Sequence, residues 1–143
     1  MCGQFGCAEV YSSAGGISRR YAQLGGDVGV PVSRLVSSTD ARAQLVWGDA
    51  TAVLGETLAN LTAVLDPQVI VLAGGVSNAG EALLAPVRNS LERALTWRKV
   101  PRLAISKLSS RAGLAGAAIE AWRLAGVADA DRSWSATVAV TAL

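Results

Sequence analysis

Apolar residues recur at helical spacing in two long stretches of this 143-residue chain. The first stretch follows Thr39 or Asp40, either of which can cap a helix. It ends at Asp66-Pro67, because proline disfavours helix in the residue before it. The pattern therefore predicts one long helix. Its apolar stripe, which we assign to the core, consists of Trp47, Leu54, Leu58, Leu61 and Leu65.

A second stripe follows Gly74-Gly75 and predicts another helix. Pro86 lies early in it, so it occupies either the first turn or a kink. The apolar residues in register are Leu84, Val87, Leu91 and Leu95.

Two short apolar segments between these helices and after them have the composition of strands. Residues 69–73 read Val-Ile-Val-Leu-Ala, an unbroken run of the kind found in parallel strands covered on both faces. Gly74-Gly75 ends this run. A second strand is predicted at roughly residues 102–108, between Pro101 and Ser109.

Weaker patterns predict two further helices. Residues 9–21 are weakly helical, and residues 27–38, which include Pro31, form a connection. Small residues predict a last helix from residue 112 to about 125, in which Gly113 and Gly116 would allow close approach of a neighbouring helix or ligand. The order helix, strand, helix, strand, helix predicts an α/β layer.

The composition is that of one folded domain. Hydrophobic residues make up 51%, charged residues 17% and aromatic residues 5%, so Ala, Val and Leu must build the interior. A net charge of +2 is too small to indicate a polyanionic partner, and Arg19-Arg20 and Arg98-Lys99 fit solvated helix faces better than a nucleic-acid site. The chain shows no signal peptide and no apolar run of membrane-spanning length. We therefore expect a soluble, cytoplasmic protein.

The start of the chain carries its only two cysteines, in the motif Cys2-Gly-Gln-Phe-Gly-Cys7. Structural zinc needs four ligands, and the chain has no third cysteine and no histidine. Two interpretations follow from the residues: unliganded thiols, or part of a site whose other ligands lay upstream.

Four blocks in order resemble the ROK family of repressors, open reading frames and sugar kinases. The likeness covers about residues 1–125, and the order and spacing of the blocks make it specific. The blocks are Cys2-Gly-Gln-Phe-Gly-Cys7-Ala-Glu9, the segment from Leu58 through Asp66-Pro67 to Gly74-Gly75-Val76, Ala79-Gly-Glu-Ala-Leu-Leu84, and Leu108-Ser-Ser-Arg-Ala-Gly-Leu-Ala-Gly-Ala-Ala118.

This resemblance implies the C-terminal part of an actin-like (ribonuclease H-like) ATPase fold. Residues 1–126 would form the sugar- and nucleotide-binding portion, and residues 127–143 a tail of unassigned structure. The catalytic aspartate, the phosphate loop and a zinc-binding histidine would lie upstream, so no residue of this chain is assigned a catalytic role. An uncovered sheet edge or face would then favour association, and we expect a homo-oligomer.

The resemblance also assigns roles to five residues. Cys2 and Cys7 would be two ligands of an incomplete structural zinc site. Glu9 would accept hydrogen bonds from sugar hydroxyls, although a glutamate in a first helical turn is also favoured by the helix dipole. Gly74 and Gly75 would let backbone approach the nucleotide, ATP with Mg²⁺ in the intact protein, although glycines also serve a tight turn. Before its Ala-Gly-Leu block the chain has Ser109-Ser-Arg111 where the family has glycine and often an acidic residue.

Three functions fit these features. The first is the C-terminal portion of an ATP-dependent, glucokinase-like hexose kinase, inactive on its own. The second is the sugar-sensing domain of a transcriptional repressor whose DNA-binding part is not in this chain. The third is an α/β domain that only dimerises through its helices. The diglycine and the Ala-Gly-x-x-Gly-Ala-Ala block favour the first.

Overall fold

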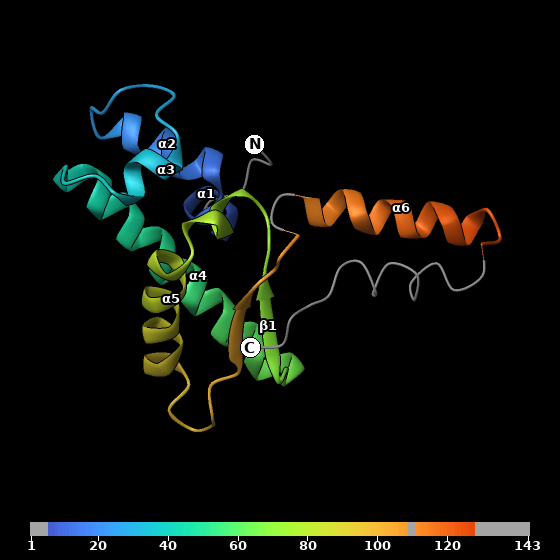
Figure 1. Ribbon diagram of the computed structural model, residues 1–143. Coiled ribbons are helices and arrows are strands. Elements are labelled where there is room, and N and C mark those ends of the chain that lie inside the picture. Colours follow the sequence, from blue (N-terminus) through green and yellow to red (C-terminus); the bar gives the residue numbers. More distant parts are fainter. Residues whose placement is uncertain (1–5, 109–110, 128–143) are drawn as a thin grey trace.

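The structure is a computed structural model that describes residues 6–108 and 111–127. A helical body lies against one face of a small two-stranded sheet, and the last helix stands apart from it (Figure 1). The elements in chain order are α1 (Ala8–Ser12), α2 (Ala14–Gln23), α3 (Val32–Val36), α4 (Ala41–Leu65), β1 (Val69–Leu72), the 3₁₀ helix η1 (Gly75–Ala79), α5 (Glu81–Ala94), β2 (Arg102–Ile105) and α6 (Ala112–Leu124). The predicted α/β class is therefore confirmed.

Helix α4 confirms the predicted bounds of the long helix but not its predicted buried face. Asp40 caps it by accepting a hydrogen bond from the Arg42 backbone N–H, and Asp66 ends it with a left-handed φ of 47°. The assignment of Leu61 and Leu65 to the core is wrong, since they are 47% and 68% exposed. The residues that α4 buries are mostly small: Ala43, Val46, Ala50, Thr51, Gly55, Leu58, Ala59 and Thr62.

Small residues face the core because α4 and α5 pack very closely. A methyl group built on Gly55 of α4 would lie 2.3 Å from the Cβ of Ser90 on α5. The Ser90 hydroxyl donates to the carbonyl of Ala52 at 3.3 Å, which fixes the same contact. Pro86 lies inside α5, which begins at Glu81, so the structure excludes the first turn, one of the two alternatives given for this residue.

The sheet consists of two parallel strands in register, with Ile70 opposite Leu103 and Leu72 opposite Ile105. Ile70, Leu72 and Leu103 belong to the core that α4 and α5 build, together with Leu58, Leu83, Val87, Leu91 and Leu95. The second strand is shorter than the sequence predicted, because it ends at Ile105. Strand β1 ends at Leu72, which lines a hollow together with Ser12 and Gly75, so the carboxyl end of β1 defines the region in which a site is sought.

The N-terminal third forms a second core around α2, α3 and α4. The predicted helix over residues 9–21 is two helices, because Ser13 is extended and its hydroxyl accepts a hydrogen bond from the Gly16 N–H as the cap of α2. The predicted connection over residues 27–38 contains a helix, α3. The buried residues of this core are Ile17, Tyr21, Leu35, Ala43, Val46 and Ala50.

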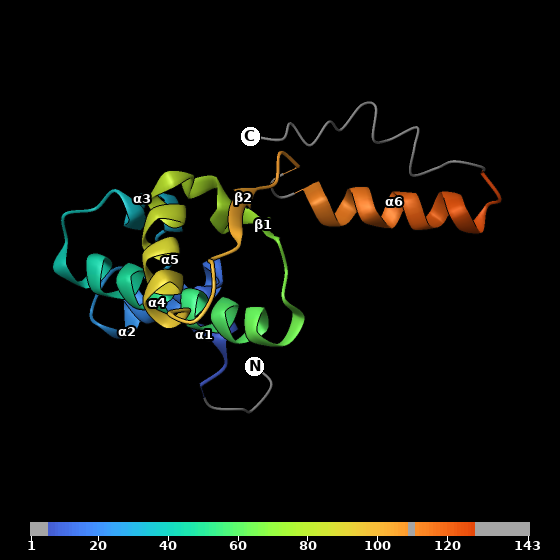
Figure 2. The ribbon, with the colours of Figure 1, turned by 90° about the horizontal axis from the view of Figure 1, so that it is seen from below.

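Helix α6 confirms the predicted last helix and projects away from the body in both views (Figures 1 and 2). The space around Gly113 and Gly116 is open among the described residues, so the close neighbour predicted for them is not found there. Within residues 6–108 and 111–127, no helix is long and apolar enough to cross a membrane. Cys2 and residues 128–143 of the predicted tail lie outside the described residues.

Candidate functional site

The diglycine turn after β1 is the centre of the candidate site. Gly74 has φ 94° and ψ −179°, a conformation that is essentially restricted to glycine. The buried Ser77 hydroxyl donates to the Gly74 carbonyl at 2.7 Å and thereby holds the turn in shape. A Cβ on Gly74 or Gly75 would meet no described atom within 4 Å. The turn thus presents bare backbone to open space.

Two hollows flank Gly75. One, of about 330 Å³, is largely apolar and is lined by Ala14, Pro31, Val32, Ser33, Val36, Gly75, Val76, Asn78 and Ala79. The other, of about 310 Å³, is lined by Ser12, Ser13, Ala14, Leu54, Leu72, Ala73, Gly75, Val76, Ser77 and Leu83. Ala14, Gly75 and Val76 line both, so the turn forms the ridge between the two hollows.

The junction of α1 and α2 forms the wall opposite the diglycine turn. The extended conformation of Ser13 brings Ser12, Ser13 and Ala14 to the second hollow. Gly16 is required here, because a Cβ at this position would lie 2.1 Å from the carbonyl oxygen of Val10. Sequence reasoning missed this wall, although the Ser-Ser-Ala-Gly-Gly run was a signal that a helix is interrupted.

The structure places Glu9 on the same segment, one helical turn before that wall. Glu9 is exposed in the first turn of α1, and its backbone carbonyl accepts a hydrogen bond from the Ser13 N–H at 3.0 Å. The helix therefore links the predicted sugar contact to the hollow beside Gly75. Glu9 itself lines neither hollow.

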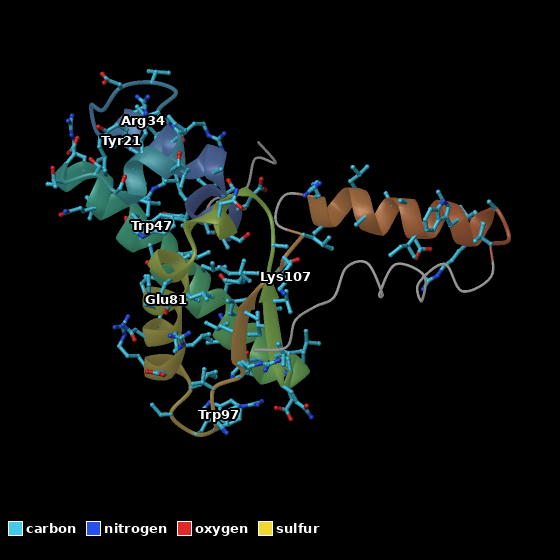
Figure 3. All side chains as sticks on the ribbon, viewed as in Figure 1. Tyr21, Arg34, Trp47, Glu81, Trp97 and Lys107 are labelled. Carbon is cyan, nitrogen blue, oxygen red and sulfur yellow. The ribbon has the colours of Figure 1, made fainter. Side chains whose placement is uncertain are left out.

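A polar cluster on the far side of α2 was not predicted from the sequence. The Tyr21 hydroxyl donates to Asp40 at 2.8 Å, and the Arg42 guanidinium donates to the same carboxylate at 2.8 and 3.1 Å. Hydrogen bonds from Arg42 and Tyr21 hold the pKa of the Asp40 carboxyl well below its usual range, and the bond to Asp40 raises the pKa of Tyr21. Figure 3 shows Tyr21 of α2 at one end of the body, far from Trp97 at the opposite end. The cluster joins the start of α4 to α2 and lines neither hollow.

The described residues do not make up a zinc site. Cys7 is half-buried at the start of α1, where its carbonyl accepts a hydrogen bond from the Val10 N–H at 3.0 Å. In the described part of the chain, no group of three or more His, Cys, Asp or Glu side chains could hold a metal ion. The other predicted ligand, Cys2, lies outside it, so the fit to a four-ligand zinc site fails on the residues described.

Comparison with known proteins identifies the fold and then the family. The ROK family model matches residues 1–123. The N-acetylgalactosamine kinase AgaK of Shewanella sp. (strain ANA-3) is 30% identical over 120 residues, covering 82% of this chain and 39% of the relative. The glucokinase of Halalkalibacterium halodurans is 35% identical over 137 residues, covering 80% of this chain and 40% of the relative.

Solved structures agree with these sequence matches. A ROK family glucokinase from Streptomyces griseus, in complex with glucose and AMPPNP, matches with a TM-score of 0.69 and 29% identity, over 81% of this chain and 44% of that chain. The ROK hexokinase from Thermus thermophilus matches with a TM-score of 0.66 and 31% identity, over 87% of this chain and 43% of that chain.

These likenesses define the class: the fold is part of the actin-like ATPase fold of sugar kinases. Within that class, the chain belongs to the ROK family. It spans about two fifths of the length of the curated relatives named above.

Proposed function

We propose that this chain is the C-terminal, nucleotide- and sugar-binding portion of an ATP-dependent hexose kinase of the glucokinase type. The observation that carries the proposal is the position of Gly75, which is open to approach between two hollows at the carboxyl end of β1. Ligands of α/β sheets bind at this end of the strands. The Streptomyces griseus relative was solved with glucose and AMPPNP, which supports the same two ligand classes here.

The nucleotide would lie along the diglycine turn. Gly74 and Gly75 allow backbone to come close to ribose or phosphate, because neither carries a side chain into the open space. The apolar hollow lined by Val32, Val36 and Val76 offers a surface for the base. In the intact protein, Mg²⁺ would accompany the ATP phosphates.

The sugar would contact Glu9. An exposed carboxylate can accept hydrogen bonds from two adjacent hydroxyl groups, which suits recognition of a hexose. Phosphoryl transfer also requires a group that orients the sugar hydroxyl and takes its proton, and no residue of this chain matches the family's catalytic aspartate. We therefore expect no kinase activity from these 143 residues alone.

The relatives named above are kinases and not repressors. This supports a kinase over the sugar-sensing domain of a repressor. The cytoplasmic location, the homo-oligomer and the incomplete zinc site at Cys2 and Cys7 remain predictions.

Calorimetric titration of the full chain with Mg-ATP tests the nucleotide site. We expect saturable binding that Gly75→Val weakens about tenfold or more, because the added methyl groups enter the space between the hollows. Gly48→Val is the matched control: Gly48 is exposed on α4, has open space around it and lines neither hollow. ATP affinity should stay unchanged in this control.

Two results would contradict the proposal. One is the absence of saturable ATP binding by the wild-type chain. The other is equal ATP affinity in the Gly75 and Gly48 variants, with both shown by circular dichroism to be folded.

A further inference from the structure

Helix α1, which carries Glu9, depends on its neighbours for its position. It is five residues long, and none of its residues is fully buried. A helix of this length is not stable by itself. It packs on both α2 and α4, so the direction in which Glu9 points depends on the side chains that join these three helices.

Arg20 of α2 joins the three helices. Its guanidinium lies over the ring of Tyr11 on α1, with Cζ 4.4 Å from the ring centroid, and its Nη2 donates to Asp49 of α4 at 2.5 Å. The Nη1 atom is buried and has no hydrogen-bond partner among the described residues. An aromatic face attracts a cation, and the attraction is stronger where water is excluded. The Tyr11 ring is therefore a second group, besides Asp49, that stabilises this charge.

The ion pair in this contact adds little to the overall stability. The side chains of Arg20 and Asp49 are 20% and 41% exposed, and ion pairs that water reaches contribute little to the free energy of unfolding. The effect of the contact is geometric. It fixes where Tyr11 lies relative to α4, the helix whose Leu54 lines the hollow beside the diglycine turn.

Tyr11 and Glu9 lie on opposite sides of α1. Successive residues of an α-helix are rotated by about 100°, so residues two apart differ by about 200°. Tyr11 faces Arg20, and Glu9, which is exposed, faces away from it. The contact with Arg20 therefore sets the direction of the Glu9 side chain from the opposite side of the helix.

We propose that Arg20 is a positioning residue for sugar binding. By holding Tyr11 against Asp49, it fixes α1 so that the Glu9 carboxylate is directed toward the sugar hydroxyls. The inference rests on the proposed function, because it takes Glu9 as the sugar contact. It adds that Arg20, which lines neither hollow, sets the affinity for the sugar without touching it.

Calorimetric titration of the full chain with glucose tests this role. Arg20→Met keeps a long side chain and removes the charge. We expect it to weaken glucose binding about tenfold and to leave the affinity for Mg-ATP within about twofold of the wild type. Arg19→Met is the matched control, because Arg19 is the exposed neighbour on α2, and its glucose affinity should stay unchanged. Tyr11→Phe, which keeps the ring, should bind glucose like the wild type, whereas Tyr11→Leu should lose as much as Arg20→Met.

A double variant separates positioning from stability. If Arg20 acts through Glu9, then Arg20→Met should have little further effect on glucose affinity in a Glu9→Gln background, because effects that pass through one contact do not add. A general loss of stability would instead weaken the binding of both ligands, and its effect would add to that of Glu9→Gln.

Hydrogen exchange checks the contact without any ligand. The backbone N–H groups of Val10 and Ser13 donate to the carbonyls of Cys7 and Glu9. In Arg20→Met these two amides should exchange about tenfold faster, while the amides of α5 should exchange at the wild-type rate, because only α1 is released.

The outcomes that overturn the proposal differ from the one that overturns the proposed function. A wild-type chain that binds no glucose contradicts the sugar contact itself and, with it, the role of Arg20. Glucose binding that is equal in the wild type and in Arg20→Met contradicts the positioning role alone. So do equal losses in the Arg19 and Arg20 variants, equal losses of glucose and ATP affinity, and unchanged exchange in α1.

Discussion

Replacing Gly55 by alanine tests the close packing of α4 on α5. The new methyl group would lie 2.3 Å from the Cβ of Ser90 and 2.6 Å from its hydroxyl oxygen. A Cβ atom cannot move away by changing rotamer, so the helices must separate by roughly 1 Å or more to reach normal contact distance. That separation also stretches the hydrogen bond from Ser90 to Ala52.

The expected loss of stability follows from three contributions. Overpacking costs about 1–3 kcal/mol. Weakening of the Ser90 hydrogen bond costs up to about 1 kcal/mol. In a helix interior, alanine is more favourable than glycine by about 1 kcal/mol, and this gain offsets the loss from the weakened hydrogen bond. We expect Gly55→Ala to lower the free energy of unfolding by about 1–3 kcal/mol.

Gly48→Ala supplies the matched control in the same helix. Gly48 is exposed with open space around it, so alanine at this position causes no clash. Its higher helix propensity should raise the free energy of unfolding by about 1 kcal/mol. Urea unfolding followed by circular dichroism measures both variants. Ser90→Gly combined with Gly55→Ala should recover part of the loss, because it removes the side chain that the new methyl group strikes.

The reasoning fails if Gly55→Ala and Gly48→Ala change stability equally. It also fails if the effects of Gly55→Ala and Ser90→Gly simply add, since residues in contact are expected to couple by about 0.5–3 kcal/mol.

The remaining predictions concern pH, metal and turnover. The pKa of Asp40 is held well below its usual range, so its contribution to stability is present above about pH 4 and is lost as the pH falls through the folded-state pKa. Asp40→Asn should flatten the dependence of urea midpoints between pH 5 and pH 2, and an unchanged slope would contradict this. Two thiolates should hold zinc poorly, so elemental analysis after dialysis should give well below one zinc per chain; stoichiometric zinc lost in Cys2→Ser would refute it. Incubation of the purified chain with glucose and ATP should yield no glucose phosphate above background, and sustained turnover would require a catalytic residue that we have not assigned.

The sequence predicted the long elements well because their signals are local. Asp40 at the start of α4, Asp66-Pro67 at its end and the β-branched run of β1 each depend on neighbouring residues only. Local sequence signals could not predict that Leu61 and Leu65 are exposed. Periodicity shows that a helix has an apolar stripe, but the turn of α4 that contacts α5 depends on the small residues around Gly55.

The candidate site was predicted in part. Gly74-Gly75 was singled out because it follows a β-branched run that predicts a strand, and the structure places it in open space at the end of β1. The predicted burial of that strand on both faces is wrong, since Val69 and Val71 are 39% and 54% exposed. The walls were missed because Ser12–Ala14 and Val32 lie some forty to sixty residues before the turn along the chain. Tertiary packing of the two cores brings these segments together, and no local pattern encodes it.

Trp47 and Val76 each pack against both hydrophobic cores, the one around α5 and the one around α2 and α3. Shared side chains of this kind make it costly for one core to open while the other stays closed, so the body should unfold cooperatively. Val76 also follows Gly75 and lines both hollows. A nucleotide that binds only the native turn should therefore raise the melting temperature of both cores together, and the fluorescence of Trp47 at their junction should report it as a single transition.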